Sequence, residues 1–161
     1  GVVSQDIFLF SDSIYNNITL RDHTISRKQV EDAARRVGAH DFISKLPGQY
    51  DFMVSERGAS LSVGQRQLIS FIRAYVYNPE VLILDEATSS VDTESELLIQ
   101  NAIEKITENR TSIIIAHRLS TIKKANKIIV LDHGKIIENG SHDELLKNNG
   151  QYKKLFDLQF K

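Results

Sequence analysis

The chain has 161 residues, of which 41% are hydrophobic and 25% charged, so it can bury the core of one ordinary globular domain. A formal net charge of −1 gives no reason to expect nucleic acid or an anionic membrane surface as an electrostatic partner. The lack of cysteine excludes disulfides, thiolate catalysis and cysteine-based metal sites. No apolar run approaches the roughly 18 residues of a membrane-spanning helix.

The first segment, residues 1–10, is predicted to be the end of a strand followed by a loop. Gln5 lies in that loop. A glutamine in such a place is more often a surface residue than a ligand. Only its position in an ordered set of motifs makes it a candidate site residue.

Residues 11–78 are predicted to be mainly helical. Ser26 and Gln29 form a capping-box pattern that starts a helix, and Gly38 should end it. A shorter helix is expected near residues 41–45.

A second capping-box pattern, Ser62 with Gln65, predicts a helix over residues 63–77 that stops before Pro79. A helix amino terminus that offers free N–H groups, a serine hydroxyl and the nearby Gly64 can bind an anion. Most capped helices bind nothing. This one becomes a candidate phosphate site because of the strand that follows it.

That strand is the most informative stretch of the chain. Residues 81–84 are four apolar β-formers that predict a short strand buried on both faces, and it runs directly into Asp85 and Glu86. In an open parallel α/β sheet, ligands bind at the carboxyl ends of the strands. One carboxylate there can hold a hard cation such as Mg²⁺, and the other can orient or deprotonate a water molecule. The alternative is a strand followed by the acidic start of a helix.

A second buried strand is predicted over residues 111–116, after a helix that starts at Thr93. It delivers His117 to the same edge of the sheet. A single histidine after a strand is usually structural, but its spacing from the two carboxylates favours a site residue. A hairpin with strands over residues 127–131 and 135–138 should follow, and then two short helices.

Two of these stretches resemble motifs of the ATP-binding-cassette (ABC) ATPases. The family signature LSGGQ is similar to residues 61–65, which read LSVGQ, with Val63 where the family usually has glycine. The Walker B strand is similar to residues 81–87, VLILDEA. A β-branched valine restricts the backbone and crowds close approach, so we expect the signature to be weakened or retuned.

Four loops extend the resemblance to the nucleotide-binding domains of exporter-type transporters. The segments at Gln5, Asp92 and His117 look like the Q-loop, the D-loop and the switch-histidine loop of the family. Residues 55–58, SERG, look like the exporter X-loop.

The resemblance implies an α/β fold, a partial P-loop NTPase (RecA-like) parallel-sheet core with an inserted α-helical subdomain. The core would comprise residues 1–10 and 79–161, and the helical subdomain residues 11–78. The phosphate-binding G-x-x-x-x-G-K-[ST] loop, Walker A, is missing, since none of the 8 glycines has the required Gly-Lys pair after it. We therefore expect the chain to be a carboxyl-terminal portion of a nucleotide-binding domain and to bind ATP poorly alone.

For the intact protein the resemblance implies a site for ATP and Mg²⁺. Asp85 and Gln5 would hold Mg²⁺, with Gln5 also reaching the attacking water. Glu86 would be the general base, and His117 would sense and position the γ-phosphate. The ATP site of a second nucleotide-binding domain, in a homodimer or a heterodimer, would be completed by Ser62, Gly64, Gln65 and Asp92.

The resemblance also implies partners and a location. The loops at Gln5 and Glu56 would contact a transmembrane domain, at the cytoplasmic face of the inner membrane, and no nucleic acid is expected. One alternative is a non-transport ABC ATPase of DNA repair or chromosome organisation, but the chain has no long coiled coil or basic surface. The other is a catalytically silent module that completes a partner's ATP site. Intact Glu86 and His117 argue against that alternative.

Overall fold

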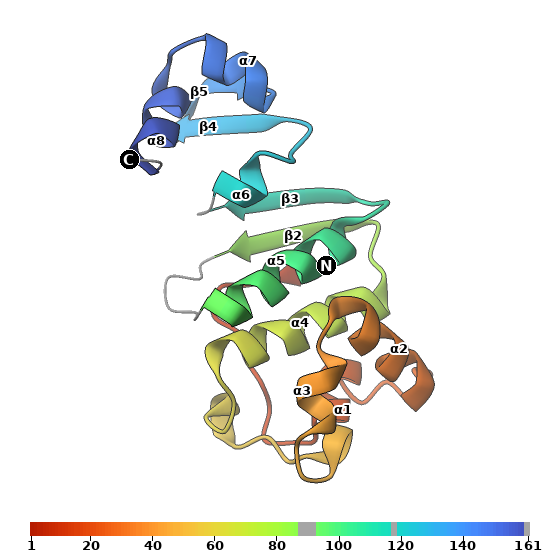
Figure 1. Ribbon diagram of the computed structural model, residues 1–161. Coiled ribbons are helices and arrows are strands. Elements are labelled where there is room, and N and C mark those ends of the chain that lie inside the picture. The colour runs from red at the N-terminus through yellow and green to blue at the C-terminus, as the bar shows by residue number, and fades with distance from the viewer. Residues whose placement is uncertain (87–92, 117–118, 160–161) are drawn as a thin grey trace. The chain divides into compact units, whose positions relative to one another are not determined.

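The computed structural model describes residues 1–86, 93–116 and 119–159. The chain forms two compact units, Gly1–Ile115 and Ala116–Lys161, and each is described by itself (Figure 1). Among the helices in the described ranges, none combines the length and the apolar character that a membrane span requires.

A three-stranded sheet underlies the first unit, in the order β1 (Val2–Val3), β2 (Val81–Glu86) and β3 (Thr111–Ala116). β1 pairs with β2 in parallel, and the register places Val3 opposite Leu84. The arrows of β2 and β3 point in the same direction in Figure 1. The carboxyl ends of these strands therefore meet at one edge of the sheet, which confirms the predicted parallel α/β arrangement.

The helices of the first unit are short except for two that pack along the sheet. They are α1 (Ile14–Thr19), α2 (Arg27–Val37), α3 (His40–Ser44), the 3₁₀ turns Gln49–Asp51 and Glu56–Gly58, α4 (Val63–Tyr77) and α5 (Thr93–Thr107). Buried side chains of α4 and α5 belong to one hydrophobic cluster with Leu82 and Leu84 of β2. Burial of this apolar surface joins the helical segment to one face of the sheet.

Reciprocal capping starts the main helices at the predicted residues. The Ser26 hydroxyl accepts a hydrogen bond from the Gln29 N–H at 3.3 Å, and Gln29 Oε1 accepts one from the Ser26 N–H at 2.8 Å. Gly38 ends α2 in the left-handed region, with φ of 80°. Ser62 and Gln65 form the same reciprocal cap at the start of α4.

The second unit is an antiparallel hairpin with helices before and after it. Its elements are α6 (Leu119–Ile122), β4 (Ile128–Asp132), β5 (Lys135–Gly140), α7 (His142–Lys147) and α8 (Gln151–Gln159). β4 pairs with β5, with a register shift between Val130 and Leu131. Its buried core contains Ile128, Leu145 and Tyr152, so the hairpin and both later helices contribute to it.

A carboxylate from the hairpin caps α8. Glu138 accepts hydrogen bonds from the backbone N–H groups of Gln151 at 2.7 Å and Tyr152 at 2.9 Å. Gly150 lies directly beneath this carboxylate, because a Cβ built at Gly150 would be 1.6 Å from Glu138 Oε1. The cap therefore requires glycine at this position.

Each unit contains a pair formed by a half-buried histidine and a buried tyrosine. In the first unit His40 Nδ1 lies 2.8 Å from the Tyr50 hydroxyl, and burial raises the pKa of Tyr50 to about 12. In the second unit His142 Nδ1 lies 2.6 Å from the Tyr152 hydroxyl, and burial raises the pKa of Tyr152. Both pairs connect residues that are 10 positions apart, so each ties a helix start to a later turn or helix.

Most predicted elements are confirmed, with small differences in their limits. The expected burial of both strands is wrong, because Val81 is 46% exposed, Ile113 55% and Ile115 52%. The strand predicted over residues 81–84 extends to include both carboxylate residues. The short helix expected near residues 41–45 begins at His40. The division into a core and a helical subdomain at residues 11–78 stays a prediction.

The sheet of the first unit carries exposed apolar side chains on the face away from the core. Ile114 packs against the core, so its neighbours in β3 point to the other face. Those neighbours are open to solvent: Ile113 is 55% exposed and Ile115 52%, and Val2 in β1 is 67% exposed. Exposed apolar patches of this kind promote association.

We expect the isolated chain to self-associate through this face. The double variant Ile113→Thr with Ile115→Thr should weaken the association, because it removes apolar area without changing the β-branched shape. The control Leu131→Thr, at another exposed strand position, should leave it unchanged. Sedimentation velocity over a range of concentrations measures the effect, and a wild-type chain that stays monomeric throughout would contradict the expectation.

Gly150→Ala should destabilise the second unit, because the new Cβ displaces the Glu138 carboxylate from the α8 cap. The loss is expected to be about 1–3 kcal/mol, measured by urea denaturation. Combining it with Glu138→Ala should cost less than the sum of the two single changes, since the displaced group is then gone. Additive costs would show that the close approach has no energetic importance.

Candidate functional site

The carboxyl edge of the sheet brings three predicted site residues onto neighbouring strands. Because Val3 is opposite Leu84, the residues that follow each of them lie at the same edge. Gln5 follows β1 as an exposed loop residue, whereas Asp85 is half-buried near the end of β2 and Glu86 ends that strand. The strand register thus places these residues at one edge of the sheet, and their assignment as a site stays a prediction.

The oxygens at this edge are of the type that Mg²⁺ prefers. The carboxylate of Asp85 and the amide oxygen of Gln5 are hard ligands. Within residues 1–86, 93–116 and 119–159 there is no cluster of three or more His, Cys, Asp or Glu side chains that could hold a metal ion. A cation at this edge would thus be held by few protein oxygens, and Mg²⁺ commonly keeps several waters and binds substrate phosphates. The residues present fit such an ion.

The amino end of α4 has the geometry of an anion site. The Ser62 hydroxyl accepts a hydrogen bond from the Gln65 N–H at 3.1 Å, and Gln65 Oε1 accepts one from the Ser62 N–H at 3.0 Å. The N–H groups of Val63 and Gly64 precede the intrahelical ladder; Val63 is exposed at this helix end and Gly64 is buried. Because its oxygen serves as the acceptor, Ser62 keeps its hydroxyl proton for an incoming anion.

Val63 fits this helix end without strain. It occupies the first position of α4, and its side chain is 41% exposed, beside these N–H groups. An apolar side chain therefore borders the anion site where the family usually has glycine. The structure accommodates the valine that the sequence analysis singled out.

The residues at the carboxyl edge of the sheet and those at the amino end of α4 lie at the same end of the first unit. α4 runs opposite to β2, so its amino end is on the side where β2 ends (Figure 1). Asp92 and His117, the other predicted site residues, lie outside the described residues. Their assignment stays a prediction.

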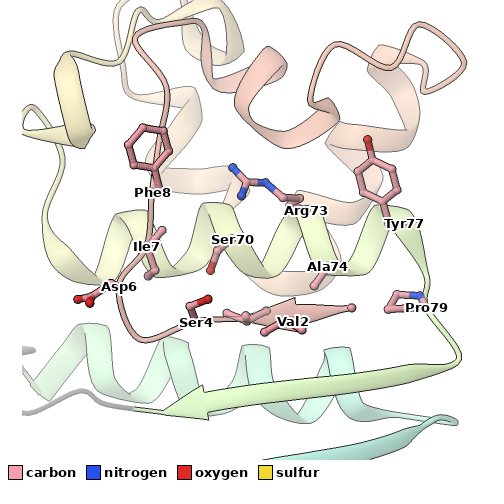
Figure 2. A pocket seen from close by; sticks show the side chains of 12 residues that line it. Val2, Ser4, Asp6, Ile7, Phe8, Ser70, Arg73, Ala74, Tyr77 and Pro79 are labelled. Carbon is pink, nitrogen blue, oxygen red and sulfur yellow. The ribbon is translucent and has the colours of Figure 1, made fainter.

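A cavity of about 290 Å³ lies beside the loop that follows β1 (Figure 2). Its wall includes Asp6 and Phe8 from that loop and Arg73 and Tyr77 from α4. The guanidinium of Arg73 points along the cavity toward Phe8 in Figure 2. The cavity wall thus combines polar and apolar groups, including the guanidinium of Arg73 and the ring of Phe8.

Arg73 has a buried nitrogen in this cavity wall that is unpaired within the described residues. Its Nε donates to the carbonyl oxygen of Asn17 at 2.9 Å, but Nη2 is buried and has no hydrogen-bond partner among the described residues. Burial lowers the pKa of Arg73. Sequence reasoning missed this residue. The only available signal was a charge within the largely apolar run of α4.

Comparisons with known proteins agree with this geometry. The family described as ABC transporter matches residues 1–89 of the chain. The chain is 50% identical to an ATP-dependent lipid A-core flippase of Syntrophus aciditrophicus, over 100% of this chain and 27% of the flippase. It is 47% identical to a Bacillus subtilis protein named as a multidrug resistance ABC transporter ATP-binding/permease protein, over 99% of this chain and 24% of that protein.

A solved structure extends the likeness to the fold. A bacterial Atm1-family ABC exporter with ATP bound superposes with a TM-score of 0.87 and 43% identity, over 99% of this chain and 28% of the exporter chain. The chain spans about a quarter of the length of the curated relatives it matches. With the family matched across more than half of its length, this chain belongs to the ABC transporter family, and its fold is that of the nucleotide-binding domain of an exporter-type member.

Proposed function

We propose that this chain forms part of the ATP-hydrolysing motor of an ABC exporter. Two such domains would pair around ATP, and their closure and opening would drive transport across a membrane. The observation that supports this most strongly is the parallel register of β1 and β2, which pairs Val3 with Leu84 shortly before Gln5 and Asp85. The amino end of α4 at the same end of the unit adds the second half of a nucleotide site.

The residues at the sheet edge would divide the chemistry between them. Asp85 and Gln5 supply oxygen ligands for Mg²⁺, which when bound neutralises charge on the β- and γ-phosphates. Glu86 takes a proton from the attacking water, which Gln5 helps to orient. His117 contacts the γ-phosphate and keeps the water in line with Glu86.

The amino end of α4 would act on the ATP of a second domain. Ser62, Gly64 and Gln65 complete that site together with Asp92, in a homodimer or a heterodimer. Because γ-phosphate contacts exist only while ATP is intact, hydrolysis shifts the population from the closed pair to the open one.

The contacts with a membrane domain would come from exposed loops. Gln5 is exposed, as are Glu56 and the neighbouring Arg57. The cavity beside the Gln5 loop, with Phe8 56% exposed at its wall, offers an apolar surface for a helix of that domain. We propose that this contact takes place at the cytoplasmic face of the inner membrane.

A phosphate loop must come from elsewhere for this site to bind ATP tightly. The G-x-x-x-x-G-K-[ST] pattern is missing from the sequence, and phosphate affinity rests mainly on the N–H groups and lysine of that loop. We therefore propose that the chain acts together with an amino-terminal segment that carries it. A catalytically silent module would have the same requirement, so activity has to distinguish the two.

Magnesium-dependent ATP hydrolysis is expected from a mixture of this chain with the segment that carries the phosphate loop, and from neither alone. Glu86→Gln in the mixture should abolish turnover and leave ATP-bound pairs, because the water then lacks its base. Phosphate release and size-exclusion chromatography measure the two effects. Hydrolysis by this chain alone would contradict the proposal that another segment must supply the phosphate loop. Unchanged turnover in Glu86→Gln would favour the silent module.

Ser62→Ala should lower kcat roughly tenfold or more, because it removes both the helix cap and a donor to the γ-phosphate. Ser26→Ala is a matched control, since Ser26 forms the same reciprocal cap on α2. Each change should cost about 1 kcal/mol of stability, which thermal unfolding checks. Equal kcat values for the two variants would remove α4 from the proposed site.

A further inference from the structure

The peptide group between Leu61 and Ser62 is held at both ends by side chains from the first turn of α4. Its carbonyl oxygen, on Leu61, accepts a hydrogen bond from Arg66 Nη1 at 2.9 Å. Its N–H, on Ser62, donates to Gln65 Oε1 at 3.0 Å. Because a peptide group is planar, these two bonds together fix its rotation. The Ser62 hydroxyl that follows this peptide group accepts a hydrogen bond from the Gln65 N–H at 3.1 Å.

Arg66 reaches this carbonyl by lying across the preceding turn. Its Nη1 also donates to the Gly58 carbonyl at 3.3 Å, and that carbonyl accepts the Leu61 N–H at 2.9 Å. Gly58 is buried with φ of +73°, and a Cβ there would be 2.6 Å from Arg66 Cδ. Only glycine therefore lets the arginine stem pack against the turn.

The turn beneath Arg66 is closed by its own hydrogen bonds. The Ser55 hydroxyl accepts from the Ser60 N–H at 2.9 Å, and the Ser60 hydroxyl accepts from the Ser55 N–H at 3.4 Å. The Gly58 N–H donates to the Ser55 carbonyl at 2.9 Å. The turn is thus a fixed support, and Arg66 attaches the start of α4 to it.

We propose that Arg66 is a positioning residue for the anion-binding end of α4. By holding the peptide plane before Ser62, it sets the direction of the Ser62 hydroxyl and of the N–H groups of Val63 and Gly64. The inference deepens the proposed function and rests on it for the nature of the anion, a nucleotide phosphate. The effect of Arg66 on local structure does not depend on ATP.

The first test uses amide hydrogen exchange in this chain, without nucleotide. The reporters are the hydrogen-bonded amides of Leu61, Gln65 and Arg66. Arg66→Met keeps the stem and removes the donors, so exchange at these amides should become about tenfold faster. Arg27→Met is the matched control, because Arg27 binds Asp51 with two hydrogen bonds at 2.9 and 3.2 Å outside the site. It should leave the three amides unchanged.

The second test measures ATP hydrolysis in the presence of the segment that carries the phosphate loop. Arg66→Met should lower kcat about tenfold, with KM for ATP within about twofold, because misdirected donors weaken the closed state and the phosphate loop still binds ATP. Arg66→Lys should recover part of the loss, since an ammonium can still donate to one carbonyl. Arg27→Met should keep both constants.

Each outcome decides one question. Unchanged exchange in Arg66→Met, or equal acceleration in Arg27→Met, overturns the positioning role. If Arg66→Met is too unstable to study, Gly58→Ala replaces it, because the new Cβ pushes the arginine off the turn; normal exchange in that variant overturns the proposal as well. Faster exchange with an unchanged kcat overturns the link to catalysis. If exchange is faster in Arg66→Met but the wild-type mixture does not hydrolyse ATP, the positioning role stands and the proposed function is overturned.

Discussion

The parallel pairing of β1 with β2 is the constraint on which the first unit depends. The amino group of Gly1 donates to the Val81 carbonyl at 2.7 Å across 80 positions of sequence. The residues between must therefore leave the sheet and return beside their own starting point, which closes a long loop at an entropic cost. The helical segment offsets that cost by burying apolar surface, and α4 returns the chain antiparallel to β2.

This return path explains why chemically different groups share one end of the unit. A helix that runs back along a parallel strand must begin where that strand ends. Its amino end therefore lies on the same side as the carboxylate residues that end β2. Attraction for anions and affinity for cations are thus placed at one end of the unit, so the same end can contribute to both ATP sites of the proposed domain pair.

The sequence was sufficient to predict structural features that depend on residues close together in the chain. The caps at Ser26 and Ser62 join residues three positions apart, so the pattern alone predicts them. The buried strand before Asp85 and the hairpin after residue 126 were readable from periodicity and turn residues. The edge that collects Gln5 and Asp85 followed from a general property of parallel sheets.

What the sequence missed depends on contacts across the fold. Arg73 looks like an ordinary helix residue until its partner, the carbonyl of Asn17, is known. The contact of Arg66 with Gly58 spans 8 positions through a turn without a simple signature. The capping of α8 by Glu138 likewise joins a strand to a later helix. Such pairings arise from tertiary packing, which local patterns do not encode.

The two histidine–tyrosine pairs give each compact unit its own spectroscopic reporter. His40 belongs to the first unit and His142 to the second, and each imidazole nitrogen is tied to a tyrosine hydroxyl. Loss of that bond changes the tautomer balance, which nitrogen-15 NMR of histidine detects directly. The native sequence can thus reveal whether the units unfold together or one at a time, without an introduced label.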